Sequence, residues 1–126
     1  MALLTPLSRA RGLGAAHGGV DHWKAQRLTA ISNALLVLWF VFSAIALTGS
    51  GYEAVRAWLA SPLVAILMTL LVISVFYHAP LGLQVVIEDY VHHRGLRVAA
   101  LAAVRLVAAG LAVACIVAIL MVALGS

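Results

Sequence analysis

His78 is the residue of this sequence that most directly suggests chemistry. It lies inside a run from Ala57 to Ile87 that holds no charged residue, and Asp89 and Tyr90 follow just after that run. At about 100° per residue on a helix, Gly82 and Asp89 fall within about 40° of His78 and share its face. A neutral imidazole nitrogen can ligate haem iron, and a neighbouring glycine lets a flat ring or another helix approach closely. Spacing alone favours neither haem ligation nor the alternative, a packing role in which His78 hydrogen-bonds to an adjacent helix.

Asp89 and Tyr90 form a second candidate site, about 16 to 18 Å along the helix from His78. A phenol hydroxyl can donate a hydrogen bond to a quinone carbonyl, and an adjacent carboxylate can orient that phenol or relay protons. The alternative is a tyrosine in the interfacial aromatic belt beside an acid that pairs with Arg94 or Arg97. Taken by themselves, the residues favour this interfacial role.

A second ligand for a haem iron is not evident in the chain. His92 and His93 lie about 21 Å further along the same helical direction, while His17 and His22 precede the first apolar run. If His78 binds haem, the opposite ligand must therefore come from another subunit.

The composition identifies the solvent around these residues. Of the 126 residues, 65% are hydrophobic and 10% are charged, with a mean hydropathy of +1.13. These values are typical of an integral membrane protein. The net charge of +4 comes from basic residues that flank the apolar runs, so they predict orientation rather than nucleic-acid binding. The single cysteine, Cys115, excludes an intrachain disulfide.

Three apolar segments are long enough to cross a bilayer, which needs about 20 residues each. We predict an all-α membrane protein with three transmembrane helices, running up-down-up, as part of a heteromeric helix bundle. The expected helices cover residues 28–48, 61–91 and 97–124 of an anchor domain at 28–126. Residues 1–27 are predicted to form a cytoplasmic arm that ends in an amphipathic entry segment. Ser61 is expected to be the N-cap and Pro62 the first residue of the second helix.

Basic residues near the predicted boundaries give the orientation. The segment before the first helix holds Arg9, Arg11, Lys24 and Arg27. The second connection holds Arg94 and Arg97, and the first connection holds only Arg56. The positive-inside rule therefore places the N-terminus in the cytoplasm and the C-terminus in the periplasm. Arg105, inside the third helix, is expected to snorkel to the interface, and His92 and His93 to lie on a solvated face.

Two motifs resemble those of the smaller hydrophobic membrane anchor of succinate dehydrogenase. The first is the pattern His-Ala-x-x-Gly-x-x-x-Val-x-x-Asp-Tyr-Val from His78 to Val91, with Arg97 six residues later. The second is "GVDHWKAQRLTAI", Gly19 to Ile31, with Arg27 just before the first span. The resemblance extends from about Gly19 to the end of the chain and includes the three spans.

This resemblance implies roles for four residues, to which helical spacing adds Gly82. His78 would be one axial ligand of haem b, the other coming from the larger cytochrome b anchor subunit. Gly82 would lie against the haem, and Arg27 would neutralise a propionate. Tyr90 would hydrogen-bond ubiquinone, with Asp89 in support.

The resemblance also implies partners and a location. Succinate would be oxidised at FAD in a flavoprotein subunit, and electrons would reach ubiquinone through the clusters of an iron-sulfur subunit. The chain would be a non-catalytic subunit of that enzyme, in a complex for which a trimer is one expected assembly. The short N-terminal arm favours the bacterial inner membrane over the mitochondrial one. The alternatives are a fumarate reductase-type quinol oxidoreductase anchor and a non-redox assembly or transport subunit.

Overall fold

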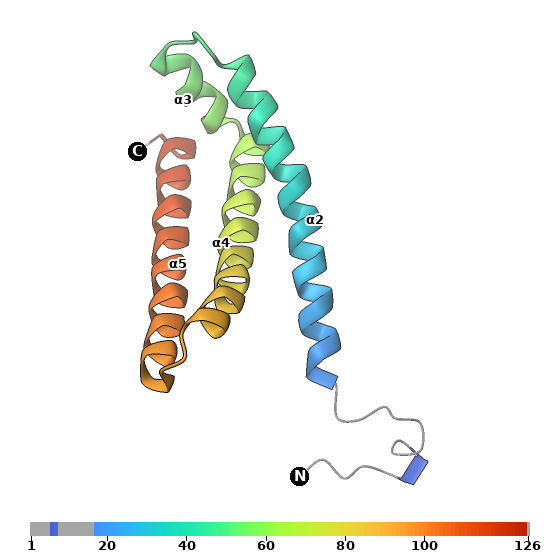
Figure 1. Ribbon diagram of the computed structural model, residues 1–126. Helices are drawn as coiled ribbons and strands as arrows, with labels where there is room; N and C mark the ends of the chain where they lie inside the picture. The colour runs from blue at the N-terminus through green and yellow to red at the C-terminus, as the bar shows by residue number, and fades with distance from the viewer. Residues whose placement is uncertain (1–5, 8–16, 126) are drawn as a thin grey trace.

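The structure is a computed structural model that describes residues 6–7 and 17–125. The elements from residue 17 onward are α2 (His17–Ala46), α3 (Tyr52–Ala60), α4 (Pro62–Tyr90) and α5 (Arg94–Ala123). Figure 1 shows the chain rising through α2, returning through α4 and rising again through α5. Arg9, Arg11 and most of the predicted N-terminal arm lie outside the described residues.

Three of these helices can cross a membrane by length and composition. They are Gly19–Ala46 within α2, α4 and α5, with 28, 29 and 30 residues respectively. At 1.5 Å per residue each is about 42 to 45 Å long, more than the roughly 30 Å of a hydrocarbon core. The prediction of an all-α membrane protein with three spans is confirmed.

The observed helix boundaries differ most from the expected ones in α2. This helix begins at His17, so the segment expected to lead into the span is continuous with it. Counting uncharged residues could not show this, because Asp21, Lys24 and Arg27 exclude a segment from lipid without preventing it from being helical. At α4, Ser61 and Pro62 occupy the predicted N-cap and first helical position, although the Ser61 side chain makes no capping hydrogen bond.

The sequence analysis did not predict α3, which occupies the first connection. Its sequence, YEAVRAWLA, contains an acidic residue in its first turn, Glu53, which complements the positive end of a helix dipole. The helix lies against α4 and α5, and the Trp58 ring stacks on Trp39 of α2 with centroids 5.9 Å apart. This helix therefore links all three spans at one end of the molecule.

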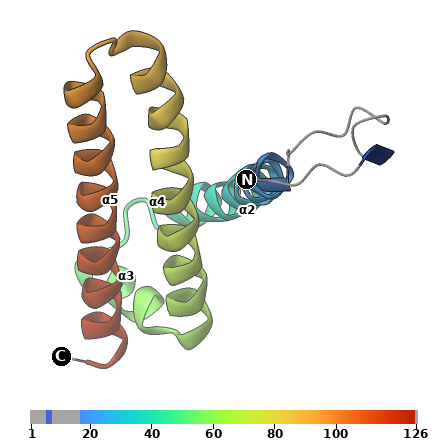
Figure 2. The same ribbon diagram turned by 90° about the horizontal axis from the view of Figure 1, so that it is seen from below.

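The spans are not packed equally against one another. Figure 2 shows α4 and α5 side by side as an antiparallel pair, with α2 directed away from them. Within the described residues, α2 packs on α4 and has no backbone contact with α5. A bundle shared with other subunits remains a prediction, as does the alternation of the spans across a membrane.

The buried core is small. Its members among the described residues are Leu71, Val72 and Ser74 of α4 with Ala108 and Ile119 of α5. Most of the large apolar side chains are exposed, including Leu28 and Phe42 of α2. In a membrane these side chains are available to lipid or to other helices.

Candidate functional site

Polar residues meet where α2 crosses α4. Thr29 Oγ1 lies 3.3 Å from Nδ1 of His78, and Ser74 Oγ donates a hydrogen bond of 3.4 Å to the Thr29 carbonyl oxygen. Ser74 and His78 are one turn apart on α4, so both face the same segment of α2. The imidazole is half-buried and Ser74 is buried. The predicted ligand His78 therefore lies at a helix crossing rather than on a lipid-facing surface.

One helical turn beyond Thr29, Asn33 extends this polar contact region along α2. Its amide oxygen is buried and has no hydrogen-bond partner in the described part of the chain. The sequence analysis assigns no role to either Asn33 or Thr29. The signal available was the spacing of the two residues, because positions four apart share a face of an otherwise apolar helix.

Toward the C-terminal end of α4, the face that carries His78 is open. A Cβ added at Gly82 would meet no atom within 4 Å, and both Val85 and Asp89 are exposed. In Figure 1, α2 and α4 diverge toward the N-terminal end of α2, which leaves this part of α4 uncovered. The face predicted for His78, Gly82 and Asp89 thus forms a surface that begins at the helix crossing and ends at Asp89.

Asp89 and Tyr90 end α4, with Val91 as the C-cap. The Tyr90 side chain is 80% exposed, and Asp89 is also exposed. Two residues after Tyr90, the Nδ1 atom of His92 lies 3.2 Å from the Tyr90 carbonyl oxygen. Asp89 and Tyr90 are therefore consecutive residues at one end of α4, and both side chains are accessible to another subunit or ligand.

Arg27 is not brought next to His78. Its side chain is exposed, and its guanidinium lies over the Trp23 ring, 5.0 Å from the centroid. Arg27 and Thr29 are two positions apart, which directs their side chains to different faces of α2. The structure gives Arg27 a cation–π contact, while its predicted role toward a haem propionate is untested.

A polar chain connects α5 to the C-terminal end of α4. Arg105 Nη2 donates to Gln84 Oε1 at 3.1 Å, and Gln84 Nε2 donates to Glu88 Oε1 at 2.8 Å. This partner for Arg105 was not predicted. The chain leads from Arg105 to the acidic residue that precedes Asp89.

His92 and His93 are exposed. His93 is the N-cap of α5, and its Nδ1 accepts a hydrogen bond of 3.2 Å from the backbone N–H of Leu96. Capping satisfies one of the backbone donors that a helix start leaves unpaired. His93 therefore has a structural role that the sequence analysis missed.

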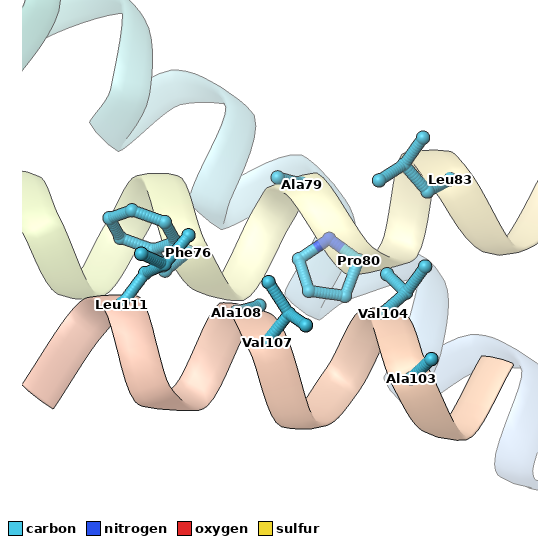
Figure 3. Close-up of a pocket in the computed structure, with 9 residues that line it drawn as sticks. All are labelled: Phe76, Ala79, Pro80, Leu83, Ala103, Val104, Val107, Ala108 and Leu111. Atoms are coloured by element: carbon cyan, nitrogen blue, oxygen red, sulfur yellow. The ribbon is translucent and has the colours of Figure 1, made fainter. Parts of the chain in front are cut away.

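The groove between α4 and α5 is separate from these polar residues. It has a volume of about 330 Å³ and is lined by Phe76, Ala79, Pro80, Leu83, Ala103, Val104, Val107, Ala108 and Leu111 (Figure 3). All of these side chains are apolar, so the groove offers hydrophobic contact and no group for proton transfer or ligation. No group of three or more metal-binding side chains occurs among the described residues.

Comparison with known proteins connects this arrangement to a family. The family model described as "Succinate dehydrogenase/Fumarate reductase transmembrane subunit" matches residues 1–124. The chain is 39% identical over 111 residues to the succinate dehydrogenase hydrophobic membrane anchor subunit of Rickettsia bellii, which covers 88% of this chain and 89% of that protein. It is 33% identical to the corresponding subunit of Rickettsia conorii, over 71% of each chain. With that of Paracoccus denitrificans the identity is 31%, over 71% of this chain and 70% of the relative.

Proposed function

Given that the chain belongs to the succinate dehydrogenase/fumarate reductase transmembrane subunit family, as a succinate dehydrogenase membrane anchor, we propose that it supplies one haem b ligand and part of a ubiquinone-reduction site. The observation that carries the proposal is the position of His78. Its ring lies at the α2–α4 crossing, next to an α4 face on which Gly82 is open. The chain therefore offers a ligand next to a surface that its own helices leave uncovered.

The residues present fit a haem. Nδ1 of His78 is engaged by Thr29, while Nε2 has no hydrogen-bond partner within the described residues. The open surface at Gly82 can admit a flat macrocycle beside the imidazole. When bound, a haem with two axial ligands supplies one-electron redox capacity. His78 would hold the iron through Nε2, Arg27 would neutralise a propionate, and the second axial ligand would come from the larger cytochrome b anchor subunit.

The quinone site would form around Tyr90. Its exposed phenol would donate a hydrogen bond to a ubiquinone carbonyl, and the adjacent Asp89 carboxylate would orient that phenol. Because both residues lie at the end of the span, a quinone head group could reach them while its isoprenoid tail stayed in hydrocarbon. The iron-sulfur subunit would complete the pocket on the cytoplasmic side.

The oxidation of succinate would take place in soluble partner subunits. A flavoprotein would remove two electrons and two protons from succinate at FAD, and an iron-sulfur subunit would carry the electrons to ubiquinone. This chain would tether those subunits to the bacterial inner membrane and shape the acceptor site. The complete complex, in some cases as a trimer, would then be the catalytic unit.

A fumarate reductase-type anchor is the second candidate, because the matched family description covers both enzymes. The relatives given above are succinate dehydrogenase subunits, which favours the first candidate. Turnover of the purified complex with succinate and ubiquinone, compared with quinol and fumarate, would separate the two.

The direct test is purification of the tagged chain from its native membrane. We expect a flavoprotein, an iron-sulfur protein and a second membrane subunit to copurify, with a reduced-minus-oxidised spectrum typical of b-type haem. A chain that purifies alone and without haem absorbance would contradict the proposal and favour a non-redox role.

A further inference from the structure

We infer that Thr29 is a positioning residue for His78, because its hydroxyl fixes which ring nitrogen is left available to bind iron. The inference rests on the proposed function and adds a residue to it. Thr29 contributes no iron ligand of its own. It lies on α2, so it would couple the placement of the first span to the ligand on α4.

The argument starts from the single proton of the Thr29 hydroxyl. Oγ1 lies 2.9 Å from the Ala25 carbonyl oxygen and 3.0 Å from the Gln26 carbonyl oxygen, and it donates to these acceptors of its own helix. A hydroxyl has one donor and two acceptor lone pairs. With its proton directed at the α2 backbone, Oγ1 meets His78 as an acceptor.

The imidazole must then supply the proton of the 3.3 Å contact between Nδ1 and Oγ1. A neutral ring that carries its proton on Nδ1 has an unprotonated Nε2 with a free lone pair. This tautomer is the one that can ligate a metal through Nε2. The contact with Thr29 thus selects the chemical form of His78 that the proposed role needs.

Contacts with both helices hold Thr29 in place: Ser74 of α4 binds its carbonyl, and the backbone of α2 binds its hydroxyl. Ser74 is buried and donates to the Thr29 carbonyl oxygen at 3.4 Å, one turn from His78 along α4. The contacts of Thr29 with its own backbone fix the direction of its side chain. Rotation of the imidazole about its Cβ–Cγ bond would break the hydrogen bond between Nδ1 and Oγ1 and leave the ring N–H without that partner.

A hydrogen bond to the non-ligating nitrogen of a histidine ligand also changes the affinity and the midpoint potential of the bound metal. A partner that accepts the ring N–H raises the basicity of the ligating nitrogen, and basic ligands favour the oxidised iron. Removing the Thr29 hydroxyl should therefore weaken haem retention and raise the midpoint potential. Substitutions at such partners commonly cost about 10-fold to 100-fold in metal affinity.

The experiment uses the purified complex with Thr29→Val, Thr29→Ser and Thr69→Val. Valine keeps the shape of threonine without the hydroxyl, and serine keeps the hydroxyl. Thr69 is the matched control, because its hydroxyl donates to the Ala65 carbonyl of its own helix at 2.8 Å and has no histidine partner among the described residues. Haem retention through detergent washes, the midpoint potential and the electron paramagnetic resonance spectrum of the oxidised haem are measured for each.

We expect Thr29→Val to lose haem about 10-fold more readily, to titrate at a higher potential and to give shifted resonance signals. Thr29→Ser and Thr69→Val should behave like the unmodified complex. The inference is overturned if Thr29→Val leaves potential and spectrum unchanged, or if Thr29→Ser is as perturbed as Thr29→Val. Those results leave the proposed function standing, whereas an unmodified complex without haem would refute both.

Discussion

His78 and Tyr90 lie on one unbroken helix, twelve residues apart, so about 18 Å of α4 separates the two proposed functional groups. Pro80 lies between them without interrupting the helix. A change at one end therefore need not displace the side chain at the other, and the haem and quinone roles can be tested separately.

Replacing His78 with alanine should remove the b-type haem absorbance of the purified complex, because iron would lose one of two axial ligands. The measurement is the reduced-minus-oxidised spectrum normalised to the flavin content. The matched control is His92→Ala, which removes an exposed histidine beyond the end of α4 and should leave the spectrum unchanged. Full haem content in the His78→Ala complex would contradict the assignment of this ligand.

Replacing Tyr90 with phenylalanine should lower kcat/KM for ubiquinone by about twofold to tenfold, which corresponds to one hydrogen bond of about 0.5–1.5 kcal/mol. Haem content should not change. The measurement is succinate-dependent ubiquinone reduction across a range of quinone concentrations. Tyr77→Phe is the control, since Tyr77 is exposed on the same helix but about a dozen residues earlier. Equal kinetics for both variants would show that the Tyr90 phenol is not part of the quinone site.

The orientation can be measured with single cysteines. In a Cys115→Ser background, a cysteine at position 50, between α2 and α3, should react with a membrane-impermeant maleimide in intact spheroplasts. A cysteine at position 92, between α4 and α5, should react only after the membrane is permeabilised. The expectation follows from the positive-inside rule applied to Lys24, Arg27, Arg94 and Arg97. The reversed labelling pattern would invert the topology.

Replacing Arg105 with methionine should leave haem content unchanged and alter the KM for ubiquinone by less than about twofold. Its hydrogen bond to Gln84 joins α5 to α4 at an exposed position, where one such contact contributes about 1 kcal/mol. The measurements are quinone kinetics and the thermal unfolding midpoint in detergent. A much larger rise in KM would instead place Arg105 in the quinone site.

The stacked rings of Trp39 and Trp58 should stabilise the attachment of α3 to α2. A double-mutant cycle with Trp39→Leu and Trp58→Leu should give a coupling free energy of about 0.5–1.5 kcal/mol, typical of aromatic pairs. The free energies come from unfolding in detergent, monitored by the helical signal in far-ultraviolet circular dichroism. Additive effects of the two substitutions would show that the rings do not stabilise each other.

The three spans could be predicted from the sequence because the energetic cost of charge in lipid leaves long uncharged runs. The same criterion missed α3, since nine residues that include Glu53 and Arg56 are too short and too charged to register as a span. It also placed the start of the first helix too late, at residue 28 instead of His17. Lys24 and Arg27 are unfavourable in hydrocarbon but compatible with a helix outside it.

The candidate site was predictable only as far as one helix reaches. Helical periodicity placed His78, Gly82 and Asp89 on one face of α4, and the structure leaves that face open beyond the crossing. The contact between Thr29 and His78 joins residues 49 positions apart. It depends on how α2 crosses α4, and no local pattern specifies a crossing. The same reason explains why the Gln84 partner of Arg105 was missed.

The packing of α2, which in the described part of the chain touches α4 and one ring of α3 but not α5, has a consequence for a copy of the chain without its partners. A copy synthesised in excess of its partners would expose to the bilayer the apolar side chains of a long helix that packs on only one other span. An isolated copy should therefore lose the packing of its first span more readily than that of the other two.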